Sequence, residues 1–255
     1  MSNDQTTIEF RDVSFALADG RKLLADLNLQ VNMGETLVLL GRSGSGKTTT
    51  MKLINRLIDP TGGEVRVDGK ATVEWDPIRL RRRIGYVIQE VGLFPHLTVE
   101  ENIGVVPRLE GWNPDRIGDR ARVLLTMVGL DADRFARRYP RELSGGQRQR
   151  IGVARALAAD PPMILLDEPF GALDPITRRE IQQEFRSLQQ ELGKTMVFVT
   201  HDIAEAFVLA TRIALLKDGE MILLGPPEDL LKSHHPEARA FAQCFHDSKG
   251  AGSPR

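Results

Sequence analysis

The residues best placed to do chemistry lie between Gly41 and Thr48, which read Gly-Arg-Ser-Gly-Ser-Gly-Lys-Thr. Two glycines that bracket four residues, followed by lysine and threonine, form the pattern of a phosphate-binding loop. Glycines let successive backbone N–H groups turn inward and approach an anion closely. We expect the Lys47 ammonium to reach the terminal phosphates and the Thr48 hydroxyl to hold Mg²⁺. The segment therefore predicts a phosphate site with a magnesium ion.

The flanking sequence supplies the strand and the helix that such a loop needs. Thr36–Leu40 is a short apolar run typical of a buried strand. Beyond the loop, Met51, Ile54 and Ile58 recur at steps of three and four residues, which predicts a helix over residues 49–58. A surface turn rich in glycine and serine is the alternative, and the order of strand, loop and helix argues against it.

A second set of candidates follows the apolar run Met163–Leu166. Asp167 and Glu168 would lie at the carboxyl end of a buried strand, the edge where α/β proteins bind ligands. We predict that Asp167 steadies Mg²⁺ through water and that Glu168 is the general base for an attacking water. General bases contribute roughly 10²- to 10⁴-fold in rate. A solvated Asp-Glu-Pro turn is the alternative interpretation.

Two further segments add polar groups of the same kind. Leu143–Gln147 contains a serine and two glycines ahead of a helical stretch, Arg148–Ala158, which is either a second anion site or a plain helix cap. His201 follows the strand-like run 196–199 and precedes Asp202. It therefore stands at the end of a predicted strand, although a lone histidine would carry no functional weight.

Alternation and apolar runs indicate how these segments are positioned. Segments 8–15, 27–31 and 64–69 alternate as antiparallel strands with one wet face do, whereas runs 163–166, 196–199 and 213–216 suit buried parallel strands. The middle of the chain, about 91–159, is helical in pattern. Ile181, Phe185, Leu188 and Leu192 share one face of a helix that begins near Pro175. The fold class is therefore α/β, with a parallel core, a helical insert and a smaller antiparallel sheet.

Composition narrows the class of protein further. The 255 residues are 41% hydrophobic and 27% charged with a formal net charge of −1, which is ordinary for a soluble domain and argues against nucleic acid as the main partner. Arg79–Arg83 is expected to be a solvated segment before the strand at 84–88. No apolar run approaches the roughly 20 residues of a membrane span. A single cysteine, Cys244, fits a reducing cytoplasm.

Together these segments resemble the nucleotide-binding subunit of an ATP-binding cassette transporter, over about Ile8 to Leu231. The resemblance identifies Gly41–Thr48 as Walker A, Gln89 as the Q-loop glutamine, Leu143–Gln147 as the signature, Met163–Glu168 as Walker B, Gly171–Asp174 as the D-loop and His201 as the switch histidine. It implies one ATPase domain over residues 1–246 with a P-loop NTPase core. That core and the antiparallel sheet would occupy about 1–88 and 160–235, the helical insert about 89–159, and a disordered polar tail 247–255.

The resemblance also assigns residues to roles in an ATPase that works as a head-to-tail pair of chains. The implied ATP contacts are Gly41, Arg42, Ser43, Gly44, Ser45, Gly46, Lys47, Thr48, Thr49 and Leu17. Catalysis would use Glu168, His201 and Gln89, and Mg²⁺ would be held by Thr48, Gln89 and, through water, Asp167. The partner chain's ATP would be contacted by Ser144, Gly145, Gly146, Gln147 and Asp174.

Segments 84–103 and 195–202 resemble importers of glycine betaine, choline and related quaternary amines. This implies a peripheral protein at the cytoplasmic face of the cell membrane, a separate solute-binding protein, and a membrane permease that docks near Gln89–Val99. For Leu93 and Phe94, a local core of the helical insert is the alternative. A phospholipid-trafficking ATPase, suggested by Pro236–Phe241, and a soluble non-transport ATPase remain open. The short tail after His246 predicts no regulation by an appended module.

One departure from the family pattern concerns the base of ATP. An aromatic side chain usually stacks on adenine just after the first strand, and alignment places Leu17 there. Phe15 could take this role if the register differs. An aliphatic contact forgoes about 0.5–1.5 kcal/mol of aromatic interaction, so we expect weaker adenine binding and a laxer choice of base.

Overall fold

The computed structural model describes residues 5–89, 92–171 and 173–250, with side chains up to residue 246. The chain forms two compact units, one from residues 1–77 and 195–255 and the other from residues 78–194. Each unit is described by itself below. Within the described residues, no helix has the length and apolar character needed to cross a bilayer.

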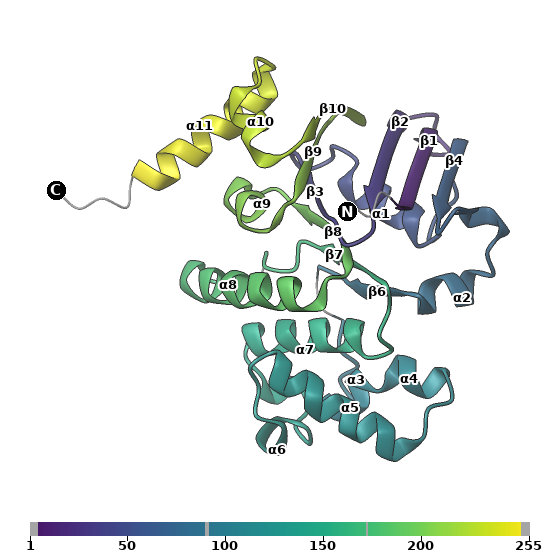
Figure 1. Ribbon diagram of the computed structural model, residues 1–255, viewed down its shortest axis with the longest axis vertical. Coiled ribbons are helices and arrows are strands. Elements are labelled where there is room, and N and C mark those ends of the chain that lie inside the picture. Colours follow the sequence, from purple (N-terminus) through teal and green to yellow (C-terminus); the bar gives the residue numbers. More distant parts are fainter. Residues whose placement is uncertain (1–4, 90–91, 172, 251–255) are drawn as a thin grey trace. The chain divides into compact units, whose positions relative to one another are not determined.

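The first unit contains two groups of strands. An antiparallel sheet has the order β2-β1-β4-β5, and β3 lies between the parallel strands β8 and β9, with β10 antiparallel to β9. Figure 1 shows β1, β2 and β4 side by side. The strands are β1 (Thr6–Ala16), β2 (Lys22–Asn32), β3 (Thr36–Leu40), β4 (Gly62–Val67), β5 (Lys70–Ala71), β8 (Thr195–Thr200), β9 (Arg212–Lys217) and β10 (Glu220–Gly225).

The described residues of the first unit also form four α-helices and one 3-10 helix. They are α1 (Lys47–Ile54), η1 (Thr72–Glu74), α9 (Ile203–Leu209), α10 (Pro227–Lys232) and α11 (Pro236–Gly250). Every residue of β3 and β8 is buried, as the solid apolar runs predict for strands covered on both faces. The alternating segments 8–15 and 27–31 became the antiparallel pair β1 and β2, which confirms the predicted smaller sheet.

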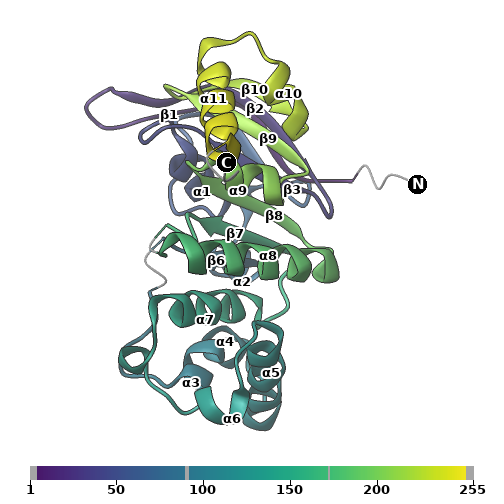
Figure 2. The ribbon, with the colours of Figure 1, turned by 90° about the vertical axis from the view of Figure 1, so that its left-hand side faces the viewer.

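The second unit is mainly helical around a parallel pair of strands, β6 (Ile84–Val87) and β7 (Met163–Asp167). Figure 2 shows α3 to α6 gathered beyond α7. The helices are α2 (Pro77–Arg82), α3 (Val99–Ile103), α4 (Val105–Leu109), α5 (Pro114–Met127), α6 (Ala132–Phe135), η2 (Pro140–Glu142), α7 (Gly145–Leu157) and α8 (Pro175–Leu192). Ile181, Phe185 and Leu188 of α8 are buried, as their spacing predicts.

The helix predicted over 49–58 is shorter in the structure, where α1 ends at Ile54. Arg56 adopts a left-handed φ of 50°, and the Leu57 N–H donates to the Lys52 carbonyl at 2.9 Å. This is the hydrogen-bond pattern of a helix C-terminal motif in which one left-handed residue stops the helix. The Arg56 guanidinium donates to the Trp75 carbonyl at 2.7 Å. This tertiary contact fixes the stop, and apolar spacing alone does not reveal it.

Candidate functional site

The phosphate loop joins the end of β3 to the start of α1 in the first unit. Gly46 begins α1 with φ 102°, and a Cβ there would lie 2.6 Å from Leu24 Cδ2 of β2. A Cβ on Gly41 would collide with the Leu216 carbonyl oxygen. Both positions therefore admit only glycine, which lets the chain turn tightly and present its N–H groups to an anion.

Lys47 and Ser45 give this loop its polar interior. The Lys47 side chain is 5% exposed, and Nζ donates to the carbonyls of Gly41 and Arg42 at 2.8 Å each. Ser45 Oγ is buried without a hydrogen-bond partner among the described residues. A buried hydroxyl without a partner is costly unless a ligand supplies one. An anion in the loop fits this arrangement, since the hydroxyl and the ammonium would both donate to it.

The predicted switch histidine lies at the same sheet edge as the phosphate loop. Strand β8 is parallel to β3 with Thr200 opposite Leu40, so His201 and Gly41 both follow the carboxyl ends of neighbouring strands. Thr200 Oγ1 donates to Glu205 Oε2 at 2.5 Å and accepts from the Asp202 N–H at 2.9 Å. The Asp202 carboxylate caps α9 by accepting from Ala204 N. His201 itself is exposed.

Leu17 and Phe15 occupy the end of the β1–β2 hairpin in the same unit. Leu17 is half-buried and closes the hairpin turn, with its N–H donating to the Arg21 carbonyl at 2.9 Å. Phe15 pairs with Leu24, the residue against which Gly46 packs. The hairpin therefore adjoins the phosphate loop, as a base-contacting segment must. Which of the two side chains meets adenine stays a prediction.

Leu17→Tyr should tighten ATP binding about 2- to 10-fold, because it restores an aromatic surface worth about 0.5–1.5 kcal/mol. Titration with a fluorescent ATP analogue checks this. Phe15→Leu serves as the matched variant: it should change ATP binding little if Leu17 is the stacking position. If Leu17→Tyr has no effect and Phe15→Leu weakens binding, Phe15 holds the role instead.

In the second unit, the parallel strands β6 and β7 bring Gln89 and Glu168 together. Gln89 Nε2 donates to Glu168 Oε2 at 3.3 Å. Asp167 ends β7 and is 6% exposed. Burial and, to a smaller extent, the Asp167 charge raise the pKa of Tyr86 to about 12. The side chains of Tyr86, Gln89, Asp167 and Glu168 thus lie at or just beyond the carboxyl ends of β6 and β7. This is the edge at which α/β proteins bind ligands.

The backbone at Glu168 has an unusual conformation. Its φ of 44° lies in the left-handed region, which non-glycine residues adopt at a cost of order 1–3 kcal/mol. Such strain clusters at functional sites, where the fold holds a side chain in a direction that relaxed backbone would not give. The fold therefore holds the Glu168 backbone in a conformation that this residue would not adopt on its own.

The signature segment is the N-terminus of α7. Ser144 Oγ accepts from the Gln147 N–H at 3.3 Å, and Gln147 Oε1 accepts from the Ser144 N–H at 3.0 Å. This reciprocal pair is a capping box. Ser144 is exposed, Gly145 is half-buried, and Gly146 is buried against α8, where a Cβ would lie 3.2 Å from Ile181 Cδ1 and from Thr177 Cγ2. Both the cap and the anion-site interpretation are compatible with this geometry.

Asp174 of the predicted D-loop caps α8. Its Oδ1 accepts from the N–H groups of Ile176 and Thr177 at 3.2 and 3.1 Å. Hydrogen bonds from Thr177 hold the pKa of the Asp174 carboxyl below its usual value. Ala172 of this loop lies outside the described residues. A role of Asp174 toward a partner chain stays a prediction.

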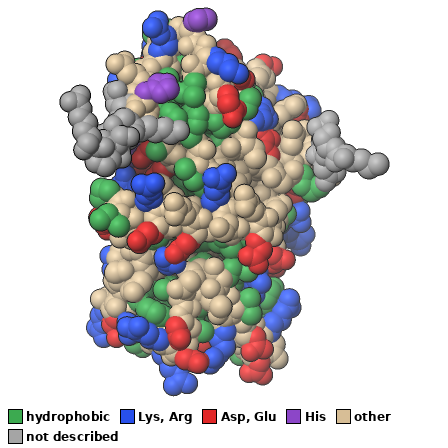
Figure 3. All heavy atoms as spheres, turned by 60° about the vertical axis from the view of Figure 1, so that its left-hand side comes forward, with side chains coloured by type: hydrophobic (Ala, Val, Ile, Leu, Met, Phe, Trp, Pro, Cys, Tyr) green, Lys and Arg blue, Asp and Glu red, His purple; other side chains and the backbone are tan. Residues whose placement is uncertain are grey.

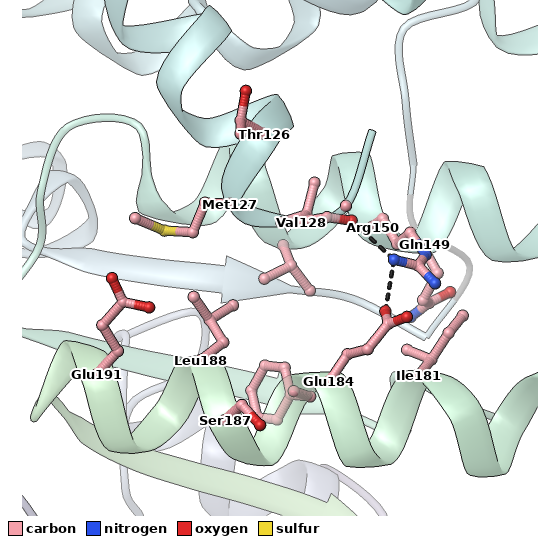
Figure 4. A pocket seen from close by; sticks show the side chains of 13 residues that line it. Thr126, Met127, Val128, Gln149, Arg150, Ile181, Glu184, Ser187, Leu188 and Glu191 are labelled. Atoms are coloured by element: carbon pink, nitrogen blue, oxygen red, sulfur yellow. Dashed lines mark hydrogen bonds and ion pairs between the residues drawn. The ribbon is translucent and has the colours of Figure 1, made fainter. Parts of the chain in front are cut away.

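A cavity of about 370 Å³ lies elsewhere in the second unit, between the end of α5, α7 and α8. Figure 4 shows its lining, which includes Met127, Val128 and Leu188 and in which Arg150 reaches Glu184. The ion pair measures 2.5 Å from Nη1 to Oε2. Gln149 also lines the cavity, and its Nε2 is buried without a partner. None of the predicted site residues lies in this cavity.

Several contacts in the structure are not apparent from the sequence. Asn102, Glu205 and the ion pair of Arg42 with Glu237 were not singled out, although the Thr98-x-x-Glu101 capping box beside Asn102 is visible in the sequence. Among the described residues, no group of three or more His, Cys, Asp or Glu side chains could hold a metal ion.

Comparison with known proteins agrees with this arrangement. A family model described as ABC transporter matches residues 24–171. The choline transport ATP-binding protein OpuBA of Bacillus subtilis is 53% identical over 226 residues, which are 89% of this chain and 59% of that protein. The glycine betaine uptake system ATP-binding protein YehX of Escherichia coli is 50% identical over 224 residues, 88% of this chain and 72% of YehX.

A solved structure of an ATP-binding cassette has a similar fold. The ATP-binding cassette MJ0796, as a post-hydrolysis dimer bound to ADP and Pi, matches with a TM-score of 0.77 and 38% identity, over 86% of this chain and 98% of that one. The chain spans 59% to 62% of the length of the first curated relatives that it matches. By sequence and by fold, the chain belongs to the ABC transporter family as an ATPase domain.

Proposed function

We propose that the chain binds and hydrolyses ATP as the nucleotide-binding subunit of a membrane importer for glycine betaine, choline or a related quaternary amine. The observation that carries this proposal is the phosphate loop, in which glycine-only turns surround Lys47 and an unpartnered Ser45 hydroxyl. The names of OpuBA and YehX support the solute class. They favour it over phospholipids as cargo and over a soluble non-transport role.

In this proposal, residues 41–49 cradle the triphosphate, with Lys47 donating to its terminal phosphates instead of to the loop carbonyls. Thr48, Gln89 and, through water, Asp167 would hold Mg²⁺, which would supply neutralising charge on the phosphates when bound. Glu168 would accept the proton of the attacking water. His201 would donate to the γ-phosphate from the edge where β8 ends.

Each chain carries one phosphate loop and one signature, so a head-to-tail pair of chains would complete two sites. Ser144, Gly145, Gly146 and Gln147 at the N-terminus of α7 would bind the γ-phosphate held by the partner, and Asp174 would lie at the same interface. The dimeric form of MJ0796 supports this assembly. We also propose that residues 1–246 act as one ATPase domain whose helical insert, about 89–159, receives the permease.

The permease would dock on Gln89–Val99, of which Glu90 and Val91 lie outside the described residues. Phe94 is 43% exposed and Leu93 is half-buried, so an apolar side chain is available for contact. The chain would be a peripheral protein at the cytoplasmic face of the membrane, working with a solute-binding protein. On the face drawn in Figure 3, basic and acidic side chains are intermixed.

The main test is release of phosphate from ATP in the presence of magnesium. Wild-type chain should hydrolyse ATP, and Lys47→Ala should lose roughly 10- to 150-fold in ATP affinity, since a charge-assisted hydrogen bond contributes about 1.5–3 kcal/mol. Equal ATP binding by both proteins would refute the phosphate-loop assignment.

The solute class is tested by purifying the chain with its permease and measuring ATP-driven uptake of labelled choline and glycine betaine into proteoliposomes.

Asn102 should be needed to shape the proposed docking loop. Its side chain is fully buried, its Oδ1 accepts from Phe94 N, and its Nδ2 donates to the carbonyls of Phe94, Leu97 and Thr98. Asn102→Leu removes these bonds and leaves buried groups unsatisfied, so the free energy of unfolding should fall by about 2–4 kcal/mol. Urea denaturation measures this loss. Hydrogen exchange should rise over residues 93–98; unchanged exchange there would show that the loop is held by other contacts.

A further inference from the structure

The phosphate loop is tied to a distant part of the chain by an ion pair. Arg42, the second residue of the loop, contacts Glu237 of α11, with 2.5 Å between Nε and Oε1. The Arg42 side chain is 70% exposed, whereas that of Glu237 is only 10% exposed. A carboxylate with so little access to water depends on its charged partner, because a buried, unpaired charge is costly.

Glu237 is held in place on the α11 side. It lies in the first turn of α11, where the helix dipole favours a negative charge. Its backbone N–H donates to His235 Nδ1 at 3.1 Å, and the His235 N–H donates to Ser233 Oγ at 3.2 Å. The carboxylate is therefore presented to Arg42 from a fixed turn and does not reach it from a mobile surface chain.

The backbone of Arg42 contacts Lys47, the residue of the loop that is expected to bind the terminal phosphates. The Arg42 carbonyl accepts from Lys47 Nζ at 2.8 Å and from the Ser45 N–H at 3.2 Å. A displacement of Arg42 would thus move the acceptor of Lys47 and the turn that carries Ser45. These are the two side chains on which phosphate binding in the loop depends.

The other end of α11 packs on the helix that follows His201. The rings of Phe245 on α11 and Phe207 on α9 are stacked, with centroids 4.2 Å apart and planes inclined by 22°. Figures 1 and 2 both draw α11 beside α9. Helix α9 begins at Ile203, two residues after His201. Helix α11 therefore contacts both the phosphate loop and the helix that follows His201, the residue expected to meet the γ-phosphate.

We infer that Glu237 is a positioning residue of the nucleotide site, which acts through Arg42 to hold the phosphate loop in its binding conformation. Helix α11 is the element that carries this contact and braces α9 at its other end. The inference rests on the proposed function, since it concerns ATP binding by the loop. It predicts that ATP affinity, more than the rate of the chemical step, depends on Glu237.

The test compares Glu237→Gln with Glu228→Gln in the full chain. Glu228 is an exposed first-turn glutamate of the neighbouring helix α10 and serves as the matched control. Glu237→Gln should raise the Kd and KM for ATP about 3- to 10-fold and change kcat less than about twofold. This is less than the loss of a direct charge-assisted hydrogen bond to ATP, because Glu237 acts through Arg42. Glu228→Gln should leave all three unchanged. Thermal unfolding of both variants identifies a general loss of fold.

A double-mutant cycle with Arg42→Ala makes the result specific, and thermal unfolding of this variant measures the cost of leaving Glu237 without its partner. Glu237→Gln should weaken ATP binding less in the Arg42→Ala background than in the wild type, because the contact that it removes is already absent there. Equal behaviour of Glu237→Gln and Glu228→Gln would overturn the inference. So would tighter ATP binding by Glu237→Gln, which would mean that Glu237 withholds the Arg42 cation from the phosphates. If wild-type chain binds no ATP, the proposed function fails and the inference with it.

Discussion

Glu168→Gln should slow ATP hydrolysis roughly 10²- to 10⁴-fold while leaving ATP binding intact. Glutamine keeps the shape of the side chain and its contact with Gln89, which measures 3.3 Å in the native chain, but it cannot accept the proton of water. Hydrolysis would no longer separate the paired chains, so the variant should accumulate as an ATP-bound dimer. Single-turnover phosphate release and size-exclusion chromatography with ATP measure the two effects.

Turnover of Glu168→Gln close to that of the wild type would show that another group takes the proton. Glu168→Asp provides the matched control, since it keeps the carboxylate and shortens its reach. It should retain more activity than Glu168→Gln. The left-handed backbone at this residue predicts that Glu168→Gly folds at least as stably, because glycine adopts φ near 44° without strain.

Two inactive variants should restore activity to each other when they are mixed. Lys47→Ala disables the phosphate loop of its own chain, and Ser144→Arg places a long side chain at the exposed start of α7 and so disables the signature. In a mixed dimer, the intact loop of one chain meets the intact signature of the other. An equal mixture should regain up to about one quarter of wild-type hydrolysis, since half of the pairs are mixed and each has one intact site of two.

This complementation distinguishes a shared site from one built within a single chain. If each chain held a complete site, the mixture would stay as inactive as its components. A mixture of Lys47→Ala with Glu168→Gln gives the matched comparison. In the mixed pair, one site would lack the loop lysine and the other would lack the general base. Neither site would be complete, so no activity should return.

Local patterns predicted the residues of the candidate site because each lies beside a strand or a helix with a strong signal. Strand β3 was predicted at its observed bounds, and Gly41–Thr48 follows it directly. Glu168 and His201 each come within a residue of the end of a buried apolar strand. In each unit taken by itself, that position places the side chain at the carboxyl edge of its parallel strands. The predicted antiparallel strands likewise needed only their alternation.

What sequence analysis missed depends on contacts between residues far apart in the chain. Arg42 and Glu237 are separated by 195 positions, and nothing near either residue indicates the other. The premature end of α1 follows from Arg56, whose side chain is held by Trp75. Asn102 looks like an ordinary polar residue of a short helix, and only the folded loop shows that it satisfies four backbone groups.

The capping of α7 has a consequence for how two chains meet. In the Ser144–Gln147 box, the serine hydroxyl uses a lone pair of its oxygen to receive the Gln147 N–H, so its own proton is not consumed. That proton can be offered outward to a phosphate oxygen without unwinding the first turn of the helix. Docking of a second chain would then require little rearrangement on this surface, and little of the association energy would be lost in ordering it.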